Sequence, residues 1–335
     1  MNKKNLINVQ GTTEGGIYDA DVTGIANFNK PKYPWATKIY DKMLELTWFP
    51  AEADLSNDKK AYNNLTEAQR RAYDLAFGRV ILLDSVATNN LMDNVNPYIH
   101  DPIVNACGAR NSFEESLHSK SYAVMAEDVC EDSEGIYELW RTDPVLLKLV
   151  NNLKEIYSLP DNPSVENLAL SNVASICLEG IHFLPSFMIF FKFADTMLGT
   201  KQMITWIARD ELSTHLPLQT NIFKQSRRDY PELNTPEFED KVNTIVRQVV
   251  DVEKEAFAYM TKDLLGFSES ICHDFVEHIA DKRLMAMGML GLYGKPNTLK
   301  SMWDKFFNFN EIKGNFFETK AVNYAKGKLD MGGDW

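Results

Sequence analysis

The segment Val80-Ile-Leu-Leu-Asp84 places a single carboxylate inside an otherwise apolar helical stretch. A buried carboxylate without a partner is costly to desolvate, so Asp84 requires either an ion-pair partner or a metal ion. Thirty-one residues later the chain reads Glu115-Ser-Leu-His118, whose spacing puts a carboxylate and an imidazole on one helix face. Glu115 and His118 can therefore hold one metal ion together, and Asp84 is a further candidate ligand.

The same order recurs further along the chain. The segment Ile176-Cys-Leu-Glu179-Gly-Ile181 again carries one carboxylate among apolar residues, and 32 residues after Glu179 comes Glu211-Leu-Ser-Thr-His215. Because residues four apart also share a helix face, Glu211 and His215 form a second such pair, and Glu179 is the matching lone carboxylate. His182, three residues after Glu179, is the alternative histidine. The two-half pattern favours His215 and leaves His182 to support a ligand or to pack in the core.

The spacing within each half fits an antiparallel pair of helices. A segment of 31 or 32 residues is long enough to run to the end of one helix, turn, and return along the next helix to the same level of the bundle. Two such pairs form a four-helix core that collects four carboxylates and two histidines at one point. Oxygen-rich ligation with two imidazoles suits a pair of iron or manganese ions better than zinc or calcium.

The rest of the chain also has helical periodicity. From Tyr33 onward apolar residues recur at helical spacing, and no alternating Val/Ile/Thr-rich run indicates a sheet. Thr66 with Gln69 makes a capping box, and Thr235 followed by Pro236 marks another helix start. The predicted class is all-α, with helices near residues 34–47, 66–91, 100–128, 144–157, 164–194, 198–226, 236–264, 269–291 and 297–307.

Composition and charge limit the possible partners. The 335 residues, 44% hydrophobic and 24% charged, are typical of one globular domain built from long helices. The net charge of -12 argues against a nucleic-acid or anionic-membrane surface, because either favours a basic patch. The N-terminus has no apolar core of signal-peptide length, and charged residues interrupt the apolar stretch 176–198. We therefore expect a cytoplasmic protein without a membrane span.

The two ends of the chain differ from its middle. Residues 1–30 are polar and contain glycine, and the last residues, from Gly314 to Trp335, mix Gly, Lys and isolated apolar side chains. Such composition buries little apolar surface. We expect a flexible N-terminal segment (1–30), a helical domain (31–313) and a flexible C-terminal tail (314–335).

The candidate ligand segments resemble, in order, those of the small, radical-bearing subunit of class I ribonucleotide reductases. The resemblance runs from about Tyr33 to the C-terminus. It implies a ferritin-like helical bundle with a dimetal-carboxylate site in a four-helix core, holding two iron ions or, with the same ligand types, two manganese ions. It rests on Asp84, Glu115-Ser-Leu-His118-Ser-Lys-Ser-Tyr122, Leu178-Glu179-Gly-Ile181 and Ala208-Arg-Asp-Glu211. By this resemblance one metal is bound by Asp84, Glu115 and His118, and the other by Glu179, Glu211 and His215.

The resemblance assigns the stored radical to Tyr122, four residues after His118. One turn beyond a ligand, its phenol can approach the metal from the same helix face. In the family's mechanism the dimetal centre activates oxygen and oxidises this tyrosine. The residues that match the apolar pocket around the radical are Phe183, Phe187 and Ile207.

A radical-transfer path is also implied by the resemblance. Trp48 matches the tryptophan that joins His118 and Asp210 in a path from the metal centre towards the surface. Tyr324 matches the tail tyrosine that relays the oxidising equivalent to a cysteine of the large subunit, where a ribonucleotide is reduced. The apolar tail residues that could anchor this segment in the large subunit are Leu329, Met331 and Trp335.

The chain departs from the family pattern between Glu211 and His215. The family usually has Glu-x-x-His after Arg-Asp, whereas this chain has one residue more. The register of the second histidine therefore depends on how the helix accommodates the extra residue. A local helix bulge could absorb it, and such bulges are frequent at functional sites.

The resemblance predicts the small subunit of ribonucleoside-diphosphate reductase, an oxidoreductase active only with its large subunit. It implies a homodimer that docks on the large catalytic subunit, and it leaves open an activating flavoprotein. One alternative is a ferritin-like dimetal oxidase or oxygenase, against which Tyr122, Trp48 and Tyr324 count together. The other is a non-enzymatic iron-binding helical bundle, against which the C-terminal tail and the unequal halves count.

Overall fold

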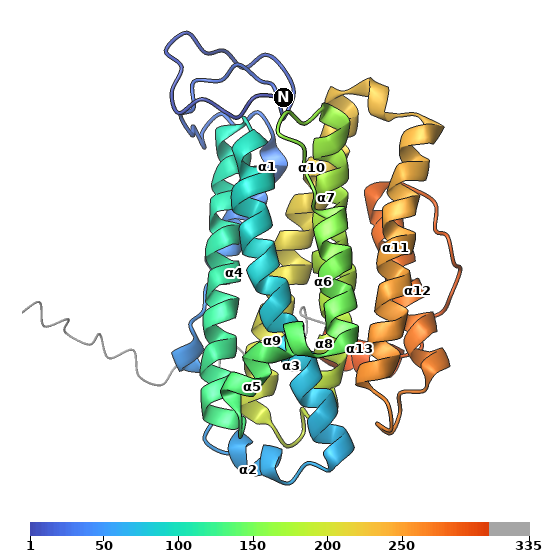
Figure 1. Cartoon of the computed structure of the whole chain (residues 1–335). Helices are drawn as coiled ribbons and strands as arrows, with labels where there is room; N and C mark the ends of the chain where they lie inside the picture. The colour runs from blue at the N-terminus through green and yellow to red at the C-terminus, as the bar shows by residue number, and fades with distance from the viewer. Residues whose placement is uncertain (308–335) are drawn as a thin grey trace, which may run out of the picture.

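A computed structural model describes residues 1–307, and Figure 1 shows their arrangement. These residues form helices and no β-strand, so the predicted all-α class is confirmed. The α-helices are α1 (Pro34–Glu45), α2 (Asp58–Asn63), α3 (Glu67–Asn90), α4 (Pro102–Val129), α5 (Ser133–Thr142), α6 (Pro144–Ile156), α7 (Val165–Cys177), α8 (Phe183–Lys192), α9 (Leu198–Asp210), α10 (Leu216–Asp229), α11 (Pro236–Met260), α12 (Glu269–Met287) and α13 (Lys300–Phe306). Three π-helical turns are Leu91–Val95, Leu178–His182 and Glu211–His215, and three 3₁₀ turns are Pro50–Glu52, Asn96–Tyr98 and Pro231–Leu233.

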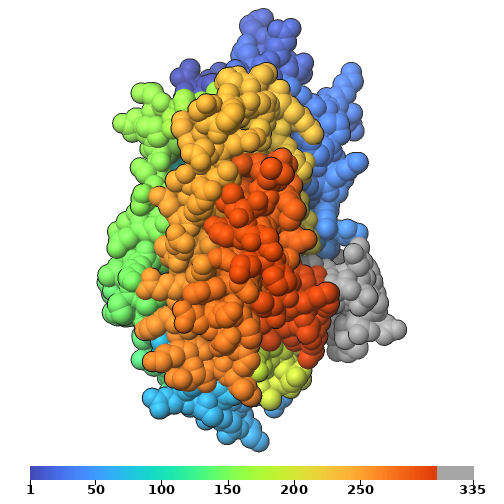
Figure 2. Space-filling view, turned by 90° about the vertical axis from the view of Figure 1, so that its right-hand side faces the viewer, coloured from blue at the N-terminus to red at the C-terminus, as the bar shows by residue number. Residues whose placement is uncertain are grey.

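Long helices stand side by side around a common core (Figure 1). α3 packs along α4 and α8, α7 packs along α10, and α9 packs against α4 and α8. A π-turn joins α7 to α8 and another joins α9 to α10, so each pair forms one long rod. α11 and α12 cover one face of this core, the orange and red surface of Figure 2. The two predicted helix pairs are therefore present, as α3 with α4 and as α7–α8 with α9–α10.

Local sequence signals set two of the helix starts. The Gln69 backbone N–H donates to Thr66 Oγ1 at 3.3 Å, and the Thr66 backbone N–H donates to the Gln69 side chain at 2.9 Å. Thr235 Oγ1 accepts a hydrogen bond from the Phe238 backbone N–H, with Pro236 in the first helical turn. Both predicted starts are confirmed, because each side chain satisfies a backbone donor that the helix itself leaves unpaired.

The sequence reasoning missed α2 and α5 and extended α12 too far. α5 has ten residues, of which only Ile136 is buried, and it begins where Asp132 accepts a hydrogen bond from the Gly135 backbone N–H. A helix this short has too few turns for its apolar spacing to stand out in a sequence, and it depends on packing against its neighbours. α12 ends at Met287, before the predicted residue 291, because Gly288 adopts a left-handed φ of 85°.

The most apolar helical stretch lies in the interior. The rod Val165–Lys192 is long and apolar enough to cross a membrane by length and composition alone. The most apolar part of this rod is nevertheless completely buried inside the protein. This part includes the carboxylate of Glu179. The stretch is thus a core helix of the bundle, in agreement with the charged residues that interrupt it.

The N-terminal segment contacts one end of the bundle, where the dark blue trace lies in Figure 1. Ile17 and Tyr18 are buried, and the Ile17 carbonyl accepts a hydrogen bond from the His100 backbone N–H at 3.0 Å. The Tyr18 ring stacks on Tyr230, whose hydroxyl donates to Asp19 at 2.7 Å. These contacts attach the part around residues 17–19 to the bundle. The division of the chain into an N-terminal segment, a helical domain and a tail, with boundaries after residues 30 and 313, stays a prediction.

Replacing Thr66 by alanine should lower the free energy of unfolding by about 1 kcal/mol, because the Gln69 backbone N–H loses its acceptor. Urea-induced unfolding followed by circular dichroism measures this change. The control is Thr66→Ser, which keeps the hydroxyl and should stay within about 0.5 kcal/mol of the parent. Equal stability of the alanine variant and the parent would contradict the capping role.

Candidate metal centre

Six polar side chains that the sequence singles out meet in the buried middle of the bundle. They come from α3, from α4 and from the two π-turns that follow α7 and α9. Each is at most 1% exposed. They form two overlapping groups whose ligand atoms lie within 4.8 Å of one another: Asp84, Glu115, His118 and Glu211, and Glu115, Glu179, Glu211 and His215. The fold thus brings together every residue predicted to bind metal.

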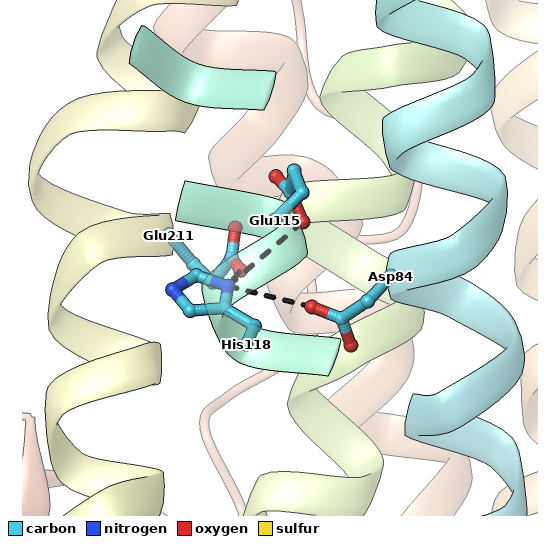
Figure 3. Close-up of side chains that lie close together, drawn as sticks. All are labelled: Asp84, Glu115, His118 and Glu211. Carbon is cyan, nitrogen blue, oxygen red and sulfur yellow. Dashed lines mark ion pairs between the residues drawn. The ribbon is translucent and has the colours of Figure 1, made fainter. Parts of the chain in front are cut away.

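Glu115 and Glu211 belong to both groups. His118 Nδ1 lies 3.8 Å from Glu115 Oε2 and 3.0 Å from Glu211 Oε1. His215 Nδ1 lies 3.0 Å from the other oxygen of each carboxylate, Glu115 Oε1 and Glu211 Oε2. Figure 3 shows Asp84 and these two carboxylates gathered around the His118 ring. Each shared carboxylate presents one oxygen to each histidine, which is the arrangement that a bridging ligand needs.

A π-helical turn absorbs the extra residue between Glu211 and His215. The turn spans these two residues and joins α9 to α10 without a break. A second π-turn, Leu178–His182, carries Glu179. A π-turn is wider than an α-helical turn because its hydrogen bonds run from i to i+5. His215 therefore faces the same side as Glu211, and the helix bulge considered for this position is confirmed.

The electrostatics of the centre follow from its burial. Burial raises the pKa of Asp84 and of Glu179 well above the ordinary carboxyl value, and neighbouring carboxylates add to the effect. Burial alone would lower the pKa of His118 and His215, but their carboxylate partners outweigh it and raise the pKa well above the usual value. Burial would raise the pKa of Glu211, but His215 and its other partners hold it below the usual range. Four interior carboxylates need positive charge beside them, which protons or bound cations supply.

Several atoms of the centre make ion-pair contacts at most, and no well-aligned hydrogen bond, among the described residues. They are both oxygens of Asp84, one oxygen each of Glu115, Glu179 and Glu211, and Nδ1 of His118. One unsatisfied buried polar atom costs about 1–3 kcal/mol, and native proteins rarely keep so many together. Metal coordination accounts for them, since carboxylate oxygens and imidazole nitrogens are ordinary ligands of iron and manganese. The residues present therefore fit a pair of such ions.

Tyr122 is completely buried one turn beyond His118. Its hydroxyl makes no well-aligned hydrogen bond among the described residues, although Asp84 lies close enough to interact with it. Burial, and then the charges of Asp84 and other carboxylates, raise the pKa of this phenol well above the usual value. The predicted pocket residues are fully buried in the same core: Phe183, Phe187 and Ile207. Tyr122 is therefore closed to bulk water, and the carboxylates of the centre lie near its phenol.

Trp48 is buried and connects to His118 through Asp210. Trp48 Nε1 donates to Asp210 Oδ2 at 2.6 Å, and the same oxygen lies 3.5 Å from His118 Nε2. The Trp48 and His118 rings also stack, with their centroids 6.1 Å apart. Arg209 pairs with the other Asp210 oxygen at 3.2 Å. Three residues of the predicted path are thus continuous in space, and the fourth, Tyr324, lies outside the described residues.

His182 lies outside both ligand groups. Its Nδ1 is 2.5 Å from Glu253 Oε1, and Arg79 pairs with the same carboxylate oxygen. Arg79 also donates to the His182 carbonyl at 2.7 Å. All three side chains are fully buried. This ion-pair group ties α3, the α7–α8 rod and α11 together, so His182 packs beside the ligand helix while His215 faces the ligands.

Two residues of the centre were not singled out from the sequence. Glu114 is buried, and its Oε2 lies 2.9 Å from His215 Nε2. The Phe77 ring meets the Tyr122 ring edge-on at 6.0 Å. A signal for Glu114 was present, because it directly precedes Glu115 as Asp210 precedes Glu211. No comparable signal distinguishes Phe77 from the other core aromatic residues.

In the metal-free protein, Glu179→Gln should raise the free energy of unfolding at about pH 8 by on the order of 1–3 kcal/mol. Because the folded-state pKa of Glu179 is raised, its contribution to stability is fully present below the unfolded pKa and is lost as the pH rises through the folded pKa. Glutamine does not ionise, so the gain should shrink as the pH falls towards about 5. Urea unfolding in the presence of a chelator at both pH values measures it.

The control for this measurement is Glu277→Gln, which changes a carboxylate that is paired with Lys254 at 2.6 Å. That variant should gain no stability at high pH, because its carboxylate already has a cation beside it. A gain for Glu179→Gln that is the same at both pH values would show that ionisation is not its cause.

Comparisons with known proteins agree with this geometry. The family model of the ribonucleotide reductase small chain matches residues 25–299. The chain is 32% identical over 326 residues to the ribonucleoside-diphosphate reductase subunit beta of Halalkalibacterium halodurans, covering 95% of this chain and 94% of the relative. It is 30% identical to the subunit of the same name from Treponema pallidum, covering 97% and 96%. The ribonucleotide reductase R2 subunit from Clostridium botulinum matches with a TM-score of 0.85 at 29% identity, covering 91% of this chain and 98% of that chain.

The match extends over nearly the whole length of both relatives, and it includes the helices that carry the six buried side chains. The fold agrees with that of a solved member at the same time. This chain therefore belongs to the ribonucleotide reductase small-chain family.

Proposed function

We propose that this chain, as the small subunit of ribonucleoside-diphosphate reductase, generates and stores a radical at Tyr122. The observation that carries the proposal is a fully buried tyrosine one turn from a buried set of carboxylates and histidines. Its relatives named ribonucleoside-diphosphate reductase subunit beta match it over nearly their whole length. The chain is an oxidoreductase subunit, and it works with a large subunit on which ribonucleotides are reduced to deoxyribonucleotides.

The metal centre in this proposal holds two ions. Asp84, Glu115, His118 and Glu211 would hold one ion, and Glu115, Glu179, Glu211 and His215 would hold the other. When bound, such a pair supplies the oxygen activation from which the oxidising equivalent for the tyrosine comes. We propose two iron ions as the cofactor. The same ligand set serves two manganese ions, because the choice between these metals depends on cellular supply as well as on ligand type.

Tyr122 has surroundings that suit a stored radical. Apolar neighbours such as Phe77 exclude water and diffusing reductants from the ring. The raised pKa of the phenol makes its anion unfavourable, so the proton must leave together with the electron. The candidate pocket residues around it are Phe183, Phe187 and Ile207.

The path out of the centre runs, in this proposal, through His118, Asp210 and Trp48. The short hydrogen bond between Trp48 and Asp210 and the stacking of Trp48 on His118 support it. A hydrogen-bonded chain of this kind can couple the movement of a proton to that of an electron. The tail residues predicted to continue the path and to anchor it in the large subunit lie outside the described residues: Tyr324, Leu329, Met331 and Trp335.

We propose a homodimer that docks on the large catalytic subunit in the cytoplasm, as membership in the small-chain family implies. An activating flavoprotein remains part of the proposal for a manganese form only. The rival function, a dimetal oxidase or oxygenase acting on its own organic substrate, is not favoured by any relative reported above. Iron storage is disfavoured for the same reason.

Reconstitution of the metal-free protein with Fe(II) followed by oxygen should give a tyrosyl signal in electron paramagnetic resonance. Tyr122→Phe should bind the same two irons and lack that signal, because only the phenol is removed. Metal analysis and the spectrum of the two proteins check both statements. Two bound irons without a radical in the parent would call for a manganese reconstitution with an activating flavoprotein, and failure there would favour the oxidase function.

Trp48→Phe should keep the two metal ions and the Tyr122 radical, but lower ribonucleotide reduction with the large subunit at least about 100-fold. Phenylalanine retains a ring but lacks the indole N–H that donates to Asp210. Trp206→Phe is the control, because it alters the neighbouring ring, 5.1 Å from Trp48, and leaves that hydrogen bond in place. Parental turnover by Trp48→Phe would exclude this path.

A further inference from the structure

Each candidate ligand histidine has a buried carboxylate at its outer ring nitrogen. Both rings point Nδ1 towards the shared ligand carboxylates. His118 Nε2 then lies 3.5 Å from Asp210 Oδ2, and His215 Nε2 lies 2.9 Å from Glu114 Oε2. Asp210 and Glu114 are each about 2% exposed. The radical-transfer path uses the carboxylate at His118, whereas nothing in the proposed function yet uses Glu114.

The two outer carboxylates are arranged crosswise. Asp210 directly precedes Glu211 at the end of α9, but it contacts the histidine of α4. Glu114 directly precedes Glu115 on α4, but it contacts the histidine that follows α9. Each ligand helix therefore supplies the outer partner for the histidine of the other. This correspondence between the two halves indicates that Glu114 serves the centre as Asp210 does.

Glu114 is itself held by a cation. Arg110, one turn earlier on α4, donates through Nε to Glu114 Oε1 at 2.9 Å. Its Nη2 donates to Thr47 Oγ1 at 2.8 Å, and its guanidinium lies over the Phe113 ring at 4.9 Å. The arginine is thus fixed on three sides. Its position leaves one carboxylate oxygen of Glu114 directed at Arg110 and the other directed at His215.

We propose that Glu114 is a positioning residue that prepares His215 to bind metal, an inference that rests on the proposed dimetal function. A neutral imidazole has a single N–H, which sits on one nitrogen or the other. By accepting a hydrogen bond at Nε2, the Glu114 carboxylate keeps the proton on that nitrogen and leaves the Nδ1 lone pair directed at the metal position between Glu115 and Glu211. It also fixes the orientation of the ring.

Glu114→Gln tests this role, because the shape of the side chain is kept while one oxygen becomes an amide NH₂. Arg110 offers only donors, so the glutamine must turn its carbonyl oxygen towards Arg110 and its NH₂ towards His215. An NH₂ facing Nε2 favours the tautomer with the proton on Nδ1, where it blocks the metal. Adding Arg110→Met removes this restraint and lets the amide turn its oxygen back to His215.

Mn(II) titration of the metal-free proteins, with metal analysis and electron paramagnetic resonance, gives the readout without any turnover assay. The parent should bind two ions and give the spectrum of a coupled pair. Glu114→Gln should bind one ion as the parent does and the other about 10- to 100-fold more weakly, giving the spectrum of isolated Mn(II). The double variant Arg110→Met/Glu114→Gln should bind the second ion more tightly than Glu114→Gln alone. Glu277→Gln, far in sequence from every ligand, is the control and should match the parent.

Two results overturn the proposal. One is parental affinity of Glu114→Gln for both ions, and the other is a double variant that binds the second ion no more tightly than Glu114→Gln. A general loss of folding does not explain a rescue by a second substitution, and circular dichroism of the metal-free variants checks folding directly. A parent protein that binds fewer than two ions overturns the proposed dimetal function itself, so the two failures are distinguishable.

Discussion

Four carboxylates and two imidazoles share one buried position in the bundle, and the rest of the structure depends on stabilising that group of charges. Burial raises the pKa of Asp84 and Glu179, and several ligand oxygens have no hydrogen-bond partner among the described residues. Such a group is destabilising unless cations or protons lie among the carboxylates. Long helices suit this task because they satisfy their own backbone groups, so only side chains need partners in the core. Burying these carboxylates without cations or protons lowers the stability of the fold. The apolar core of the bundle offsets this loss.

Hydrogen bonds around the centre lead to one short segment at its edge. Trp48 donates to Asp210, and Arg209 pairs with Asp210 while donating to the Leu46 carbonyl at 2.7 Å. On the other side, Arg110 pairs with Glu114 and donates to the Thr47 hydroxyl. Both outer carboxylates are thus fixed by contacts with residues 46–48, just after α1. The orientation of both histidines is coupled to this segment, which also contains the tryptophan proposed to pass the oxidising equivalent outward.

The two π-turns that carry candidate ligands show how function modifies the helices. Glu211 and His215 are four residues apart where the family pattern has three, and the wider turn takes up the additional residue without ending the rod. The turn at Leu178–His182 carries Glu179, and the buried group of His182, Glu253 and Arg79 fixes this turn against α3 and α11. Local geometry that is less favourable than an α-helix is therefore kept where ligands must face the centre, and packing against neighbouring helices maintains it.

The sequence alone determined the helical class, the two-half order of the ligands and the helix starts at Thr66 and Thr235. Each of these follows from local spacing: apolar periodicity, residues on one helix face, and a side chain that accepts from a nearby backbone N–H. Only the tertiary structure decided that Glu115 and Glu211 are shared by both ligand groups and that Glu114 contacts His215. Those relations join residues about a hundred positions apart, and no local spacing encodes which side chains of two packed helices meet.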